Sequence, residues 1–290
     1  MKVITEISKA FDKVAAQYDA LAKIQKEIGE RLFKRLDWLK INPRFILDVG
    51  CGPGYFSERL QKQFPKATVV GLDLAYGMVK QAKGRQSWWH PWPLVNADML
   101  SMPFATSAFD LIFANQVIHW SPSLNDAMRE LNRVMNVSGC LMFSTLGPDT
   151  FIELREAWAL VDSNAHVNDF KDMHDIGDCL MTEHFLDPVV DRELLKAHYS
   201  SLPQLLTSLK AQGVRNIHAA RPSGLTGRHA RSRFERAFST CCTPEGRYPL
   251  TYDVVYGHAW KGTQRRLLEG TETRVAVSSV GVKNKAKGIL

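Results

Sequence analysis

The sequence lacks the features of membrane and secreted proteins. It has no apolar run of 18 or more residues, which predicts no membrane-spanning helix. Its first ten residues lack the apolar core of a signal peptide. Cysteine is scarce, with five in 290 residues, an odd number at no metal-ligand spacing. We therefore expect reduced thiols in a cytoplasmic protein that holds no metal.

Two common nucleotide-binding motifs are also missing from the glycine-rich stretch at residues 50–54. A phosphate loop needs a lysine that does not follow here, and a dinucleotide fingerprint needs a glycine where Tyr55 stands. What is present is an apolar run over residues 45–49 that leads into three alternate glycines. This pattern predicts a buried strand, a tight turn close to a ligand, and a helix from about Tyr55.

Three acidic residues stand at or just after the ends of predicted strands. Asp48 precedes the glycines, Asp73 ends the run 68–73, and Asp98 follows the run that ends at Ala97. One such carboxylate can accept both hydroxyls of a ribose. Three of them around one pocket would repel a polyphosphate, so they favour a nucleoside that carries positive charge.

These residues resemble the class I S-adenosylmethionine-dependent methyltransferases. The resemblance rests on Asp48-Val-Gly-Cys-Gly-Pro-Gly54, on Asp73 and on Asn96-Ala-Asp-Met99, and it covers about residues 40–150. The alternative is a structural strand, turn and helix that bind no ligand. The resemblance implies that S-adenosylmethionine is the cofactor and that it is bound by Tyr18, Gln25, Asp48, Gly50, Cys51, Gly52, Gly54, Asp73, Leu74, Met78, Asp98, Met99 and Asn115.

The alternation of strands and helices predicts a doubly wound α/β fold. With the resemblance, we expect a Rossmann-like, seven-stranded, mostly parallel sheet whose last strand is antiparallel, with helices on both faces. We expect an N-terminal helical lid at 1–40, a cofactor-binding core at 41–150, the rest of the sheet with substrate-binding insertions at 151–260, and a disordered tail at 261–290. Tyr18 is either a core aromatic of an amphipathic helix or part of the lid.

Two further stretches leave alternatives open. The loop 86–93 contains Trp88, Trp89 and Trp92, whose rings pack either on the fold or on a partner, and we expect packing on the fold. The segment 166–178 is rich in His and Asp, which allows a metal site or helix caps. We favour caps, because acidic residues are common at helix starts.

The second half of the chain resembles the BioC family of malonyl-acyl carrier protein O-methyltransferases. Its motifs lie at 172–178, 213–216, 224–227 and 251–260, and a matching N-terminal pattern begins at Phe11. The family methylates the free carboxylate of malonyl-acyl carrier protein. The ester disguises malonyl as a fatty-acid primer on the way to the pimeloyl part of biotin.

The chain carries a net charge of +7, and its excess of basic residues lies in the last quarter. A localised basic face indicates either an acidic partner or a solvated surface. The resemblance implies that the partner is an acyl carrier protein with malonyl-phosphopantetheine. No nucleic-acid motif accompanies the charge. We expect a monomer that binds neither nucleic acid nor membrane and that meets the carrier through Arg215, Arg221, Arg228, Arg231, Arg233 and Arg236.

The chemistry implied by the family needs no general base, because a malonyl carboxylate is already ionised near neutral pH. Alignment of the reacting groups would supply most of the acceleration. The candidates for substrate positioning are Tyr18, His119 and Arg155. Arg155 would hold the carboxylate with two parallel hydrogen bonds, or it is a surface arginine. His119 is a substrate contact or a packed histidine.

A second class of protein is also consistent with the sequence. Mitochondrial complex I assembly factors share the methyltransferase domain and parts of the C-terminal pattern. A protein of that kind would hydroxylate a protein subunit or only bind S-adenosylmethionine.

Overall fold

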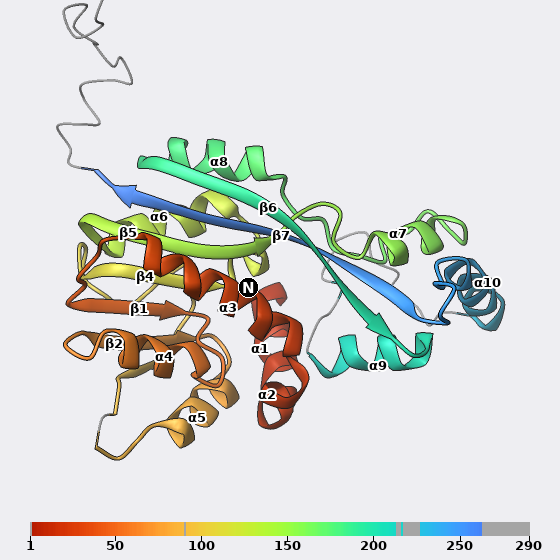
Figure 1. Ribbon diagram of the computed structural model, residues 1–290, viewed down its shortest axis with the longest axis horizontal. Helices are drawn as coiled ribbons and strands as arrows, with labels where there is room; N and C mark the ends of the chain where they lie inside the picture. Colours follow the sequence, from red (N-terminus) through yellow and green to blue (C-terminus); the bar gives the residue numbers. More distant parts are fainter. Residues whose placement is uncertain (1, 90, 213–215, 217–226, 263–290) are drawn as a thin grey trace, which may run out of the picture.

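A computed structural model describes residues 2–89, 91–212, 216 and 227–262. Its centre is a seven-stranded sheet in the order β3-β2-β1-β4-β5-β7-β6 (Figure 1). The first five strands pair in parallel, and β7 runs antiparallel to both of its neighbours, β5 and β6. This confirms the expected fold class. The strands are β1 Phe45–Val49, β2 Thr68–Asp73, β3 Leu94–Asn96, β4 Phe109–Asn115, β5 Met135–Leu146, β6 Phe185–Tyr199 and β7 Tyr248–Lys261.

The central strands are apolar on both faces, because helices cover both. On β1, Ile46 faces a core that includes Phe33 and Phe56, whereas Leu47 faces one that includes Met128 and Leu180. Alternate residues of a strand point to opposite sides, so each neighbour in this run is buried in a different layer. The first layer contains α3 Lys23–Arg35 and α4 Tyr55–Gln63, and the second contains α6 Leu124–Val134 and α8 Met173–Thr182.

The N-terminal helices approach the carboxyl ends of the strands. They are α1 Lys2–Val14, α2 Tyr18–Leu21 and the start of α3. Two hydrogen bonds join α1 to the region after β2: Gly77 N donates to Asp12 Oδ1 at 2.7 Å, and Ser8 Oγ donates to Leu74 O at 3.4 Å. Helix α1 therefore lies against α5 Tyr76–Arg85. The role of residues 1–40 as a lid stays a prediction.

Strands β6 and β7 form a long hairpin-like ribbon that extends past the rest of the sheet (Figure 1). Beside its far part lie α7 Ile152–Ala159, α9 Leu202–Ala211 and α10 Arg228–Ser239. Leu205, Phe234 and Tyr252 from these elements share one buried cluster with the first layer. The insertions are thus continuous with the main core.

Two of the three tryptophans in the loop before β3 do not pack as we expected. Trp92 is buried and lies against the Gly54 turn, but Trp88 and Trp89 are 88% and 79% exposed. Their two rings contact each other at a centroid distance of 5.3 Å. The expectation of packing is therefore wrong for Trp88 and Trp89, because the loop carries them away from α5 into solvent.

The acidic segment before α8 provides a helix cap. Asp172 Oδ1 accepts a hydrogen bond from His174 N at 2.8 Å at the start of that helix. In the described part of the chain, no three His, Cys, Asp or Glu side chains gather as a metal site would require.

The expected tail at 261–290 lies, apart from Lys261 and Gly262, outside the described residues.

Candidate active site

The site begins at the turn between β1 and α4. Gly50 has φ of +67°, and a Cβ there would lie 2.6 Å from Val117. Gly54 has φ of +82° and is the N-cap of α4, and a Cβ there would lie 3.1 Å from that of Ala82. Residues that carry a side chain rarely adopt a positive φ, so both positions require glycine. The turn can then pass close to Val117 and to Ala82 of α5 without a clash.

The backbone of this turn is bonded to the end of β2. The N–H groups of Gly50 and Cys51 both donate to Leu72 O, at 2.8 and 3.0 Å. Gly52 N donates to Asp73 Oδ2 at 2.9 Å, and Gly54 N donates to Cys51 O at 3.0 Å. Together these bonds place Asp48, near the end of β1, beside Asp73 at the end of β2.

Burial raises the pKa values of both of these acids. Asp73, whose Oδ1 also accepts from Ala75 N at 2.8 Å, has a pKa raised to about 6 by burial. Asp48 is 2% exposed and accepts a hydrogen bond from Ser57 Oγ at 2.6 Å, and burial raises its pKa to about 7. Desolvation disfavours a carboxylate charge, whereas a bound cation would favour it. The arrangement suits a positively charged ligand.

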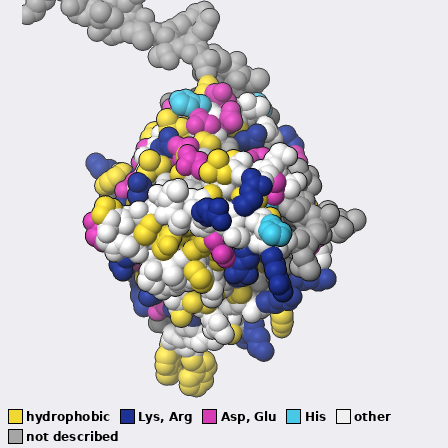
Figure 2. Space-filling view, turned by 90° about the vertical axis from the view of Figure 1, so that its right-hand side faces the viewer, with side chains coloured by type: hydrophobic (Ala, Val, Ile, Leu, Met, Phe, Trp, Pro, Cys, Tyr) yellow, Lys and Arg dark blue, Asp and Glu magenta, His cyan; other side chains and the backbone are white. Residues whose placement is uncertain are grey.

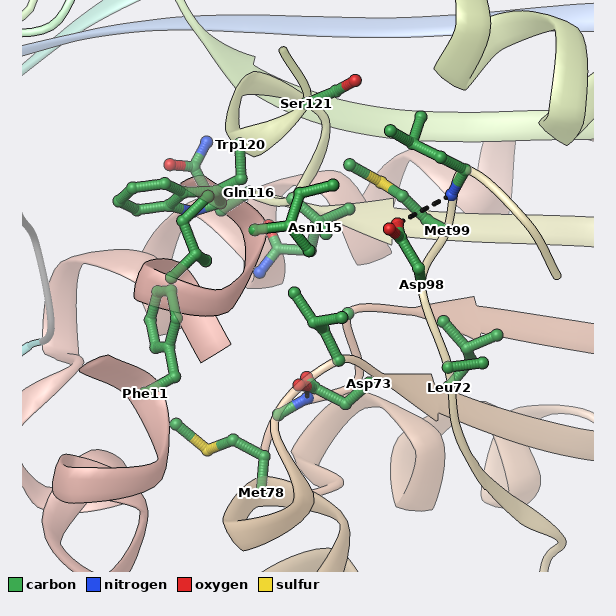
Figure 3. A pocket seen from close by; sticks show the side chains of 18 of the residues that line it. Phe11, Leu72, Asp73, Met78, Asp98, Met99, Asn115, Gln116, Trp120 and Ser121 are labelled. Carbon is green, nitrogen blue, oxygen red and sulfur yellow. Dashed lines mark hydrogen bonds between the residues drawn. The ribbon is translucent and has the colours of Figure 1, made fainter. Parts of the chain in front are cut away.

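A cleft opens at the carboxyl ends of β1, β2 and β4 (Figure 3). We call its larger part the nucleoside half; it contains about 760 Å³ of empty space, some of it open to solvent. Figure 3 shows Asp73 and Asp98 on the sheet side, and Phe11 of α1 faces them from the lid side. The predicted cofactor residues that line this half are Tyr18, Gly50, Gly52, Asp73, Leu74, Met78, Asp98, Met99 and Asn115.

The smaller part of the cleft, which we call the amino-acid half, lies on the other side of Tyr18. Its lining also includes Asp19, Lys26 and Tyr55, which we did not predict. The predicted residues here are Tyr18, Gln25, Asp48, Gly50, Cys51, Gly52 and Asn115. Gly54 lines neither half, so the structure gives it a role in the turn.

A third cavity, the acceptor chamber, adjoins both halves of the cleft. Its twelve lining residues come from both ends of the chain and include His119, Phe151, Phe170 and Gln212. Gln25 Nε2 donates to Gln212 Oε1 at 2.9 Å, which closes the chamber between α3 and the end of α9. A ligand here would meet a bound cofactor where the cavities join.

Two residues line all three cavities. They are Tyr18 at the start of α2 and Gln116 just after β4. Burial raises the pKa of Tyr18 well above its usual range, so its hydroxyl stays protonated and can donate a hydrogen bond. Phe11 packs edge-on against Tyr18 and Trp120, which closes the junction from the side of α1.

Gln116 was not among the site residues that the sequence predicted. Its φ is +55°, an uncommon conformation for a residue with a side chain, and its N–H donates to Ser144 O at 3.0 Å. Such strain is frequent at functional sites. The only signal in the sequence was the position of Gln116, directly after the strand that ends at Asn115.

His119 lines the acceptor chamber, and burial lowers its pKa to about 3. Its ring packs against Trp120 and Phe170, and its Nδ1 is 3.5 Å from Thr145 Oγ1. The imidazole is therefore neutral, which suits a hydrogen-bond contact and not an ion pair.

Arg155 stands beside the acceptor chamber but does not line it. Its guanidinium bonds to Asp169 at 3.3 Å and to Asn168 O at 3.2 Å, and Asn168 is a lining residue. The role of Arg155 as the carboxylate ligand stays a prediction.

Of the six arginines expected to meet the carrier, four lie exposed on α10, and Arg215 and Arg221 lie outside the described residues.

The cavities fit the parts of S-adenosylmethionine. The nucleoside half pairs an apolar lining with Asp73 for the ribose, and the amino-acid half offers Asp48 to an ammonium. The sulfur would lie between them, near Tyr18. Fold and site together define a class I S-adenosylmethionine-dependent methyltransferase.

Comparisons with known proteins agree and are more specific. A family described as "Methyltransferase domain" matches residues 47–143. The YcgJ protein from Bacillus subtilis, at 14% identity, superposes with a TM-score of 0.58 over 81% of this chain and 99% of its own, which supports the fold. A malonyl-[acyl-carrier protein] O-methyltransferase from Legionella pneumophila is 62% identical over 98% of this chain and 100% of its own. One from Halorhodospira halophila is 39% identical over 94% of each chain. The chain belongs to the malonyl-[acyl-carrier protein] O-methyltransferase family.

Proposed function

We propose that this enzyme transfers a methyl group from S-adenosylmethionine to the free carboxylate of malonyl-acyl carrier protein, and that the ester enters pimeloyl synthesis for biotin. The observation that carries the proposal is the acceptor chamber, which opens onto the cofactor cleft at Tyr18 and Gln116. The relatives are malonyl-[acyl-carrier protein] O-methyltransferases by name, and one of them is 62% identical over nearly the whole chain, which supports the choice of substrate.

The residues of the chain have little acid–base work in this reaction. The cofactor, when bound, supplies an electrophilic methyl group on a positively charged sulfur. The malonyl carboxylate is ionised before it arrives, so no side chain has to remove a proton. Tyr18 and neutral His119 orient the carboxylate by donating hydrogen bonds, and Phe11 and Trp120 exclude water from the junction. Positioning in a dry site is the main contribution of the protein.

Arg155 is the proposed ligand of the carboxylate charge. Its present contacts are one carboxylate and two backbone carbonyls, which hold the guanidinium near the loop that carries Asn168. A malonyl carboxylate would compete well with these carbonyls, because charge-assisted pairs are stronger than bonds to neutral acceptors.

The carrier protein docks, in this proposal, on the exposed face of α10. That face carries Arg228, Arg231, Arg233 and Arg236, while Phe234 and Phe238 anchor the helix in the core. Figure 2 looks at this end of the molecule and shows many Lys and Arg side chains over its lower half, whereas most Asp and Glu side chains lie above. Complementary charge speeds the encounter with an acidic carrier and fixes its orientation.

The same proposal assigns roles to the chain segments. Residues 1–40 act as the lid, 41–150 as the cofactor core, and 151–260 as the part that receives the carrier.

Among the described residues, no helix is both long and apolar enough to cross a membrane. The odd number of cysteines favours a reducing compartment, and we place the reaction in the cytoplasm.

The test compares two acyl groups on one carrier. Purified enzyme and methyl-labelled S-adenosylmethionine are mixed with malonyl-carrier or acetyl-carrier protein, and label on the carrier is counted. We expect transfer to the malonyl form only, because acetyl has no free carboxylate. Equal transfer to both, or to neither, would refute the proposed substrate.

A further inference from the structure

The amino-acid half of the cofactor cleft must receive the methionine end of the cofactor, which carries both an ammonium and a carboxylate. Asp48 and Asp19 line this half; Asp19 is paired with Arg85, and Asp48 suits the ammonium. The carboxylate needs donors instead. In a glycine-rich turn, the first candidates are the backbone N–H groups of the turn itself.

In this protein those N–H groups are already used. Gly50 and Cys51 donate to Leu72 O, Gly52 donates to Asp73, and Gly54 donates to Cys51 O. Pro53 has no N–H. The turn therefore positions β1 against β2 and has no unused donor to offer an anion.

Lys26 is the one cationic side chain among the described residues that line this half. Its Nζ lies 3.9 Å from the centre of the Tyr55 ring, and Tyr55 is the first residue of α4. The ammonium is thus held beside the start of that helix, where unpaired N–H groups and the helix dipole also favour an anion.

Among the described residues, the Lys26 ammonium makes the ring contact with Tyr55 and attracts the Glu30 carboxylate, but it forms no ion pair or hydrogen bond. The nearby Glu30 is occupied by Tyr55 Oη and by the guanidinium of Arg59. Lys26 also lies in the first turn of α3, where a positive charge opposes the helix dipole. A lysine that slightly destabilises its own helix and faces a ligand cavity is better explained by the ligand.

We infer that Lys26 is a cofactor-positioning residue, whose ammonium, steered by the Tyr55 ring, binds the carboxylate of the methionine moiety of S-adenosylmethionine. The inference rests on the cofactor lying with its methionine end in the amino-acid half. It does not depend on the identity of the methyl acceptor.

The test uses two ligands that differ only at the amino-acid end. S-adenosylhomocysteine carries the carboxylate, and 5′-methylthioadenosine lacks the whole amino-acid group. Calorimetry on the full chain compares the wild type with Lys26→Met. We expect S-adenosylhomocysteine to bind about ten-fold more weakly to the variant, a typical loss for a charge-assisted contact. Binding of 5′-methylthioadenosine should stay within about two-fold, because its contacts lie in the nucleoside half.

Two further variants separate charge from structure. Lys26→Arg should keep most of the affinity for S-adenosylhomocysteine. Lys23→Met, one turn away and lining none of the cavities, should change neither ligand. An equal loss for both ligands, or no loss for either, would overturn the inference. A wild type that binds S-adenosylhomocysteine no better than 5′-methylthioadenosine would also overturn it, since the amino-acid end would then not be held, whereas methyl transfer to malonyl could still proceed.

Discussion

The N–H of Gly52 donates to the carboxylate of Asp73 at 2.9 Å, so the glycine turn and the second acidic strand end form one unit. The other oxygen of Asp73 accepts from Ala75 N at 2.8 Å. Both oxygens are thereby fixed in orientation, and each keeps a lone pair for a ligand. The acid can serve the ribose without having to be ordered when the cofactor arrives.

Replacing Asp73 should therefore weaken cofactor binding. In Asp73→Ala, we expect the affinity for S-adenosylhomocysteine to fall about ten-fold or more, because hydrogen bonds to a carboxylate are lost. Isothermal calorimetry measures this loss. Asp37→Ala serves as the control, since Asp37 lies on the short helix Leu36–Trp38 and lines none of the cavities. An unaltered affinity in Asp73→Ala would contradict the ribose assignment.

Cofactor affinity should rise with pH. Burial raises the pKa values of Asp48 to about 7 and of Asp73 to about 6 in the free protein, so both take up protons as the pH falls through this range. A cationic ligand binds the ionised carboxylates best and lowers their pKa values when it binds. Affinity for S-adenosylmethionine should thus be highest above pH 7 and decline below it.

Calorimetry at about pH 5.5 to 8 follows this decline, and linkage relates its slope to the protons released. The neutral ligand 5′-methylthioadenosine, which has no ammonium or sulfonium, is the control and should show a flatter profile. If both ligands lose affinity in parallel, the decline does not arise from the cationic groups of the cofactor, and this prediction fails.

Arg155→Ala tests the proposed carboxylate ligand. We expect the KM for malonyl-carrier protein to rise about ten-fold, because a charge-assisted pair is removed, while the affinity for S-adenosylhomocysteine stays the same. Arg129→Ala is the matched control: this arginine is also held by acidic partners, Asp126 and Glu183, but, unlike Arg155, it bonds to no residue that lines the acceptor chamber. Unchanged kinetics with the malonyl carrier would remove Arg155 from the mechanism.

Charge reversal on α10 tests the docking face. In the double variant Arg231→Glu, Arg236→Glu, we expect the KM for malonyl-carrier protein to rise about ten-fold. Activity with malonyl-coenzyme A, which has no protein part, should change little. The control reverses Lys80 and Lys83, two exposed lysines of α5.

Added salt should weaken use of the carrier protein in the wild type more than in the α10 double variant, since surface charges are screened. A loss of the same size in the α5 control variant would point to net charge and not to a docking surface.

The part of this site that the sequence predicts best is local. The apolar run, the glycine spacing and the strand ends predict the strand, turn and helix start at residues 45–55 and the position of Asp73. They do so because neighbours in the chain determine that geometry. The antiparallel last strand was expected from the resemblance, and β7 does pair antiparallel with β5 and β6. The observed elements and sheet order confirm the predicted strands and fold, whereas the roles of the site residues stay predictions.

The residues that we missed come together only in three dimensions. Gln116 and Lys26 lie 90 positions apart in the chain, and neither belongs to a motif that we could read. Each matters because β4 and α3 bring it to the same cleft. Trp88 and Trp89 show the opposite error: composition favoured burial, but the geometry of the loop exposes them.

The most direct test of the central claim locates the transferred methyl group. After a single turnover with methyl-labelled S-adenosylmethionine, the malonyl-carrier protein is isolated and treated with mild base. A carboxyl methyl ester releases the label as methanol, and this is the predicted result. Label that stays on the protein after base treatment, or no label on the malonyl carrier at all, would contradict the proposed function.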